Sequence, residues 1–170
     1  GNLTSMVDNT GTTTYAYDRL NRKATKGMLG QTNVCSYTLP DGTLVSGLVC
    51  YTYDSASNLL SLQDSGGTVS YTYNTLNELA TLTGPGDPTA LTFGFDNNHN
   101  RTTTTFPGNS VQTVTLDSAQ RMTGISVVNG ATTLNNLTYS FQNGGADTAL
   151  VQSIVRSDNT NNNSTTTNTY

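Results

Sequence analysis

Pairs of large side chains separated by one small residue recur along the chain, and each pair is followed by Asp, Asn or Gln. Alternate side chains in a β-strand share a face, so one face of each segment carries the large groups. The other face carries Thr, Ser, Ala or Gly, and the pattern predicts a strand at every copy. The copies are Tyr15-Ala16-Tyr17-Asp18, Tyr51-Thr52-Tyr53-Asp54, Tyr71-Thr72-Tyr73-Asn74, Phe93-Gly94-Phe95-Asp96, Val114-Thr115-Leu116-Asp117 and Tyr139-Ser140-Phe141-Gln142.

These copies begin 36, 20, 22, 21 and 25 residues apart, a period near 21 with one long interval. A second half follows most copies, in which a short polar turn leads to an apolar strand start such as Asn58-Leu59-Leu60. Asp and Asn initiate such turns by accepting nearby backbone N–H groups. Each repeat is therefore expected to be a β-hairpin, and hairpins gain stability by stacking. We predict an all-β fold of stacked hairpins that form a spiralling or solenoid-like antiparallel sheet.

The predicted domain organisation is a repeat array over residues 1–155, an insertion and a polar tail. Gly1-Asn2-Leu3-Thr4 has the form of a trailing half without its leading half, so we expect the chain to begin in mid-repeat. The long interval predicts an inserted hairpin at about 27–50, with its turn at Pro40-Asp41-Gly42. The tail, residues 156–170, is rich in Asn, Thr and Ser. Such a segment needs a partner for its backbone, and an intersubunit strand is one candidate.

The insertion carries the two cysteines of the chain, Cys35 and Cys50. They are expected on adjacent strands or flanking the hairpin, where a disulfide would attach the insertion to the sheet. Two buried, reduced thiols are the alternative. Five Asn-x-Ser/Thr sequons are candidate glycosylation sites, although a chain this rich in Asn and Thr produces some by chance. They begin at Asn2, Asn100, Asn136, Asn162 and Asn163.

Composition excludes several classes of function. The net charge is −4 and only 11% of residues are charged, which argues against nucleic acid because phosphate binding needs clustered Lys and Arg. No stretch has the roughly 18 apolar residues of a membrane span. His99 is the single histidine and lies at an expected turn, so no nucleophile and base arrangement stands out. We expect no catalytic residue, no metal site and no cofactor.

The recurring motif resembles the consensus of the RHS/YD-repeat family, roughly Tyr-x-Tyr-Asp-x-x-Gly-Asn/Arg-Leu-Thr. The likeness covers residues 1 to about 155, and the consensus Gly is replaced by Asn21, Ser57, Asn77, His99 and Gln120. The resemblance implies a long spiralling β-sheet. In bacterial RHS proteins and insecticidal toxin complexes such sheets form hollow shells around a toxic cargo, and in teneurins and wall-associated proteins they serve adhesion. The self-cleavage motif of toxin-bearing members, Asp-Pro-x-Gly, is not matched because Asp87-Pro88-Thr89-Ala90 lacks the Gly.

The sequence thus favours a non-catalytic structural segment of an extracellular or cell-surface bacterial assembly, forming a shell wall, stalk or fibre. Its expected partners are copies of itself or the rest of a longer repeat chain. One alternative is a fragment of a toxin-encapsulating RHS cocoon, and another is a surface adhesin in which exposed rings bind a glycan. The residues expected to matter are those of an aromatic ladder, namely Tyr15, Tyr17, Tyr51, Tyr53, Tyr71, Tyr73, Phe93, Phe95, Tyr139 and Phe141.

Overall fold

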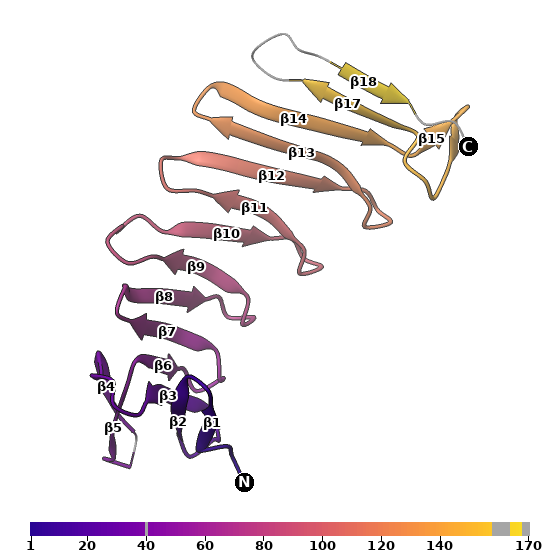
Figure 1. Ribbon diagram of the computed structural model, residues 1–170. Helices are drawn as coiled ribbons and strands as arrows, with labels where there is room; N and C mark the ends of the chain where they lie inside the picture. The colour runs from indigo at the N-terminus through magenta and orange to yellow at the C-terminus, as the bar shows by residue number, and fades with distance from the viewer. Residues whose placement is uncertain (40, 158–163, 168–170) are drawn as a thin grey trace. The chain divides into compact units, whose positions relative to one another are not determined.

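The computed structural model describes residues 1–39, 41–157 and 164–167, and this part of the chain is all-β, without helices. It divides into two compact units, Gly1–Ala90 and Leu91–Tyr170. In both units the strands run antiparallel to their neighbours in a succession of stacked hairpins (Figure 1). The expected all-β fold of stacked antiparallel hairpins is confirmed.

Seven strands of the first unit pair side by side in chain order, apart from one excursion. Each leading strand carries the aromatic motif and each trailing strand follows the polar turn. The excursion is the hairpin of β4 (Cys35–Thr38) and β5 (Leu44–Gly47), which pair only with each other among the described strands. The seven are β1 (Ser5–Asp8), β2 (Gly11–Tyr17), β3 (Lys23–Met28), β6 (Val49–Tyr53), β7 (Leu59–Asp64), β8 (Gly67–Tyr73) and β9 (Leu79–Thr83).

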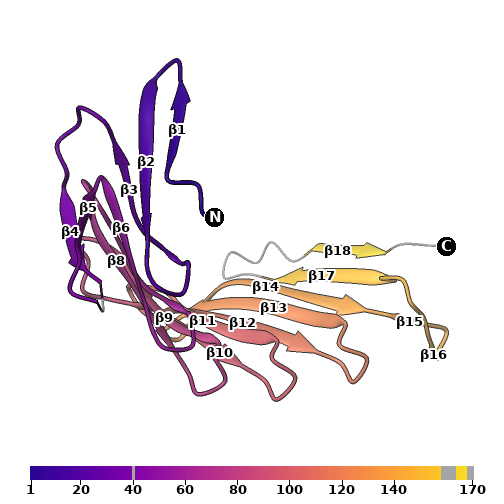
Figure 2. The ribbon, with the colours of Figure 1, turned by 90° about the horizontal axis from the view of Figure 1, so that it is seen from below.

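The second unit repeats this arrangement, with its longest strands at β13 and β14. A small hairpin of β15 (Gln142–Asn143) and β16 (Ala146–Asp147) replaces the turn that follows the last aromatic pair. Within the polar tail, β18 pairs with β17 of the same chain, so these four described residues have a backbone partner in the chain along one edge (Figure 2). The seven paired strands are β10 (Leu91–Phe95), β11 (Arg101–Thr105), β12 (Ser110–Leu116), β13 (Met122–Asn129), β14 (Thr132–Ser140), β17 (Ser153–Ser157) and β18 (Ser164–Thr167).

The strand register gives the main sheet of each unit two different faces. One is the aromatic face, and the other, the hydroxyl face, carries Thr and Ser side chains. Tyr51 lies opposite Leu62, and Tyr71 lies opposite Leu82. The small residue between the two rings points to the other side, where the Thr72 and Thr81 hydroxyls form a hydrogen bond of 2.7 Å. Cross-strand hydroxyl pairs of this kind stabilise a sheet by a fraction of a kcal/mol to about 1 kcal/mol each.

A β-bulge precedes the second large residue of five of the six motif copies. The pairing register shifts between Ala16 and Tyr17, and the same shift recurs at the motifs of β6, β8, β10 and β12. A bulge places one extra residue in a strand and increases its local twist. The bulge therefore brings the second ring and the following Asp into the same position at the end of each of these strands.

Burial is shallow outside the inserted hairpin. All ten ladder aromatics are half-buried, and no described side chain is both large and fully enclosed. The buried apolar residues among those described are Ala24, Cys35, Leu39 and Cys50. All four lie in or beside the β4–β5 hairpin, which covers part of β3 and β6. Within each unit, most of the sheet is thus a single layer that no other described segment of that unit covers.

Candidate functional site: the repeat junctions

The Asp turns share one set of hydrogen bonds. At the first turn the Asp18 carboxylate accepts the N–H groups of Leu20 and Arg22, each at 2.9 Å. The Asp18 N–H in turn donates to the Arg22 carbonyl at 2.9 Å. The short side chain of Asp or Asn reaches backbone N–H groups nearby, which is why these residues initiate turns. The same bonds recur at Asp54, Asn74, Asp96 and Asp117.

The third residue after each turn-forming Asp or Asn adopts a left-handed conformation. The φ angle is 60° at Asn21, 72° at Ser57, 62° at Asn77, 66° at His99 and 63° at Gln120. These five positions correspond to the Gly of the RHS/YD consensus that the sequence resembles, and Gly would suit them because it accepts positive φ without a steric penalty. A residue with a Cβ is strained there by about 1–2 kcal/mol.

Ser57→Gly is therefore expected to raise the free energy of unfolding by about 0.5 kcal/mol. Relief of the left-handed strain exceeds both the added entropy of the unfolded chain and the loss of a weak 3.2 Å bond from Arg22. Urea denaturation measures the difference. The matched control is Ser70→Gly in β8, where the backbone is extended and Gly should destabilise. A Ser57→Gly chain less stable than the parent would contradict the strain argument.

The turn carboxylates titrate below their ordinary range. The Asn58 and Asn100 side chains and backbone N–H groups lower the pKa of Asp54 and Asp96. At Asp117 the backbone and side chain of Arg121 lower the pKa. Desolvation alone would raise the pKa of Asp18, and the bonds from Arg22 and Leu20 outweigh it.

Acid is consequently expected to destabilise the fold. Because these carboxyl pKa values lie lower in the folded than in the unfolded chain, their stabilisation is complete above the unfolded value near 3.8. It is lost as pH falls through the lower folded values. Urea midpoints between pH 7 and pH 2.5 should therefore decline below about pH 4. Asp54→Asn, which copies the natural Asn74 turn, should make the decline shallower, and an unchanged profile would refute this origin.

Side chains at the end of one turn hold the next turn in both units. The fourth residue after Asp18, Asp54 and Asp96 donates from its own turn to the left-handed residue of the following turn. Thus Asn58 Nδ2 donates to Asn77 Oδ1 at 2.8 Å. Equivalent bonds join Asn100 to Gln120, and Asn2 to Asn21 at the start of the chain.

Arginine makes a stronger version of this link at two junctions. Arg22 pairs with Asp18 at 2.6 Å, donates to the Asp54 carbonyl at 2.7 Å and stacks 4.8 Å from the Tyr53 ring centroid. Arg121 pairs with Asp117 and with Asp147 of β16, and it stacks 4.3 Å from the Phe141 ring centroid. A guanidinium fork satisfies a carboxylate and an aromatic face together, which the compact lysine ammonium cannot.

Tyrosine hydroxyls tie the aromatic rows to the preceding repeat. The second Tyr of a motif donates to the carbonyl at the start of the earlier trailing segment. These bonds run from Tyr17 to Leu3 at 2.9 Å, from Tyr53 to Lys23 at 3.0 Å and from Tyr73 to Leu59 at 3.0 Å. These three ladder tyrosines are therefore junction residues as well as packing residues.

A disulfide joins Cys35 of β4 to Cys50 of β6 and attaches the inserted hairpin to the sheet. Of the two alternatives left open by the sequence, the structure has the bonded pair. The hairpin also approaches β3 closely, because a Cβ added at Gly47 would lie 2.7 Å from the Lys26 carbonyl oxygen. Glycine at this position is what allows β5 to lie against β3.

Three sequon asparagines already donate side-chain hydrogen bonds within the chain. Asn2 and Asn100 hold turn residues, and Asn136 Nδ2 donates to Ser157 Oγ at 3.1 Å. A glycan occupies the same amide nitrogen, so modification would compete with these contacts. Asn162 and Asn163 lie outside the described residues.

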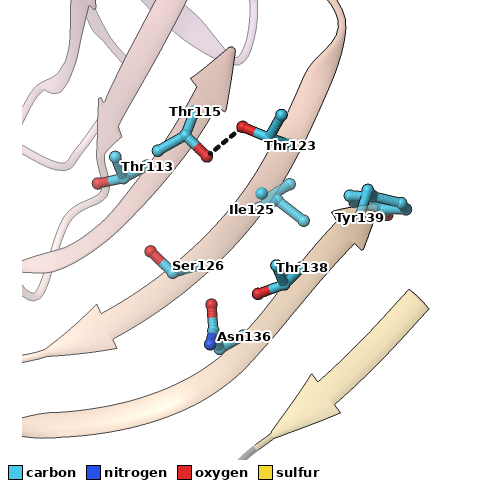
Figure 3. A pocket seen from close by; sticks show the side chains of 9 residues that line it. Thr113, Thr115, Thr123, Ile125, Ser126, Asn136, Thr138 and Tyr139 are labelled. Atoms are coloured by element: carbon cyan, nitrogen blue, oxygen red, sulfur yellow. Dashed lines mark hydrogen bonds between the residues drawn. The ribbon is translucent and has the colours of Figure 1, made fainter. Parts of the chain in front are cut away.

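A groove lies on the hydroxyl face of the second unit, over β12, β13 and β14 (Figure 3). It has a volume of about 300 Å³ and is lined in part by Gly124, where an added Cβ would lie 2.7 Å from Thr115 Oγ1. The Thr115 and Thr123 hydroxyls bond at 3.2 Å at its margin. Its polar lining is Thr113, Thr115, Thr123, Ser126, Asn136, Thr138 and Tyr139. These groups form hydrogen bonds, but they bring no carboxylate, imidazole or thiol into the groove.

The aromatic rows were predictable from the sequence, whereas the residues that connect one turn to the next were not predicted. Arg22, Asn58, Asn100 and Arg121 share a signal, since each stands four positions after a turn-forming Asp. His99 occupies one of the left-handed turn positions. No group of three or more His, Cys, Asp or Glu able to hold a metal was found among the described residues. The same residues contain no helix long and apolar enough to cross a membrane.

Comparison with known proteins gives likeness of fold. The crystal structure of TcdB2-TccC3 without its hypervariable C-terminal region matches with a TM-score of 0.66 and 18% identity, covering 98% of this chain and 9% of that one. TcdB2-TccC3-Cdc42 matches with a TM-score of 0.56 and 17% identity, covering 92% and 10%. The Photorhabdus luminescens Tc holotoxin pore with a TccC3 variant matches at 0.55 and 16% identity, covering 91% and 7%.

This chain therefore spans a tenth or less of each of these Tc toxin chains and shares their fold over that length. No protein-family model matches the sequence. No curated protein matches it either.

Proposed function

We propose that this chain is a non-catalytic wall segment of a larger RHS-type shell. The observation that carries the proposal is the likeness to TcdB2-TccC3, which covers 98% of this chain at a TM-score of 0.66. The resemblance to the RHS/YD motif supports the same proposal, because shells are one of the architectures that this resemblance implies. Of the structural roles open to the sequence, the cocoon fragment is the one that the comparison supports.

The physical character of the repeats suits a wall. Each unit is mostly a single layer of strands. Hydrogen bonds that run from one repeat to the next stabilise this layer. Arg22, Asn58, Tyr53 and Tyr73 all make such bonds. Stability in such an array is close to a sum of repeat and neighbour terms, so a wall grows by adding repeats. We assign the ladder aromatics to contacts between neighbouring repeats and not to a binding site.

We also propose that the assembly works outside the cytoplasm. The Cys35–Cys50 disulfide supports this location, because disulfides persist in oxidising compartments and are rare in the cytosol. The partners of the segment would then be the other repeats of the same shell.

Electron microscopy and mass analysis of the protein from its native source test the proposal. A wall segment predicts hollow particles built from a polypeptide much longer than 170 residues that contains this sequence. Continuous fibres with an axial repeat of one 170-residue chain would instead establish a self-assembling subunit and refute the shell.

A further inference from the structure

Two asparagines of the chain, Asn129 and Asn143, are followed directly by glycine, and both lie at hairpin turns. An asparagine in this position is chemically labile, because a glycine has no side chain to hinder approach of its backbone nitrogen to the asparagine amide carbon. Both asparagines are exposed, as are Gly130 and Gly144 after them, so water and base reach each dipeptide. By sequence alone the two sites are equally reactive.

The fold holds the two sites differently. Asn129 is the last residue of β13, and its backbone lies between Ser110 of β12 and Thr132 of β14. Asn143 pairs with Ala146, in a hairpin whose two strands have two residues each and pair only with each other among the described strands (Figure 2). Local opening requires less free energy where fewer backbone bonds and less buried surface are given up. The turn at Asn143 is therefore the more accessible to a reaction that needs the backbone to leave its hairpin geometry.

The same small hairpin is held to the preceding turn by Arg121. One guanidinium nitrogen donates to both oxygens of the Asp147 carboxylate, at 2.9 and 3.1 Å, and another donates to the Thr148 carbonyl. The Thr148 N–H closes the segment by donating to the Phe141 carbonyl at 2.8 Å. Asp147 follows directly after the residue that pairs with Asn143. A change in backbone length at Asn143 would therefore displace the groups that Arg121 holds.

We infer that Asn143 is a site of spontaneous deamidation and that its isoaspartate product releases the β15–β16 hairpin from Arg121. The Gly144 backbone nitrogen, after losing its proton to base, attacks Cγ of Asn143. A C–N bond forms, the bond from Cγ to Nδ2 breaks, and the side-chain nitrogen takes up a proton from water and leaves as ammonia. The product is a cyclic succinimide, which water then opens at either of its carbonyl carbons.

The two directions of ring opening have different consequences. Addition of water to Cγ gives aspartate, which adds a negative charge and keeps the backbone unchanged. Addition to the backbone carbonyl carbon gives isoaspartate, in which the main chain runs through Cβ and Cγ. The main chain is then longer by a methylene group at a hairpin whose geometry depends on its short loop. The pairing of Asn143 with Ala146 and the position of Asp147 against Arg121 are lost in this product.

Ageing of the full 170-residue chain in mildly alkaline buffer tests the site. Cleavage after Tyr139 or Phe141 separates the two dipeptides, and mass spectrometry together with enzymatic methylation of isoaspartate measures each. In the folded chain Asn143 should deamidate about tenfold faster than Asn129. In urea the two rates should be similar, because neither dipeptide is then held in a hairpin. Asn143→Gln should remove the fast site and leave the rate at Asn129 unchanged. Similar rates at both sites in the folded chain would overturn the inference.

Hydrogen exchange tests the release of the hairpin. Aged protein should contain a fraction in which the Thr148 amide exchanges faster than in fresh protein. The matched control is Asn143→Asp, which carries the same added charge on an unaltered backbone and should exchange as the fresh parent does. Equal Thr148 exchange in aged protein and in Asn143→Asp would overturn the release.

A variant of Arg121 tests the link between the two. Arg121→Lys keeps the charge and removes the forked contact with Asp147, so deamidation should become faster at Asn143 and stay unchanged at Asn129. An unchanged rate at Asn143 would show that Arg121 does not hold this hairpin closed.

Discussion

Replacing Cys35 and Cys50 by Ala is expected to lower the free energy of unfolding by about 3 kcal/mol. The disulfide closes a segment with a sequence separation of 15, and cross-linking a loop of that length removes about 3 kcal/mol of entropy from the unfolded chain. Both residues are buried, at 8% and 4% exposure. Chemical denaturation under non-reducing conditions measures the loss.

The structure also predicts where the loss appears first. Among the described strands β4 and β5 pair only with each other, so without the disulfide the hairpin is held by packing and by the bond from the Leu48 N–H to the Lys26 carbonyl of β3. Hydrogen exchange should therefore rise in Leu44–Gly47 before it rises in β7 or β8. Parent protein treated with a strong reductant is the control and should match the double variant. Equal stability of the oxidised parent and the variant would show that the pair contributes no constraint.

Tyr53→Ala is expected to cost about 3 kcal/mol. A fully buried ring would cost about 3–5 kcal/mol on truncation, and Tyr53 is half-buried, which reduces that contribution to about 2 kcal/mol. Loss of the hydroxyl bond to Lys23 and of the Arg22 stacking adds about 1 kcal/mol or more. Urea denaturation of the purified variant measures the sum.

Tyr53→Phe separates these contributions, because it keeps the ring and the stacking and removes the hydroxyl. It should cost about 1 kcal/mol. Tyr37→Ala is the matched control, since Tyr37 is a half-buried tyrosine of the inserted hairpin and no part of a repeat junction. A Tyr53→Ala effect no larger than that of Tyr37→Ala would contradict the junction role.

Several features of the junctions were predictable because they depend on residues close in the chain. The turn at Asp18 is closed by atoms within four residues, so an Asp after each aromatic pair is sufficient to predict it. The consensus Gly positions likewise indicated turns, and each adopts positive φ whatever residue it holds. The contact between Arg22 and Tyr53 was not predictable in this way. An insertion separates the two residues, and only the stacking of repeats brings them together.

The sequence by itself determined the strands, their period and which side chains share a face, because these follow from local backbone preferences and from a side-chain period of two. Tertiary structure alone decided between the disulfide and free thiols, placed β4–β5 against β3 and left the aromatic rows half-buried. These features depend on distances between residues far apart in the chain and on what covers each surface, which no local pattern encodes.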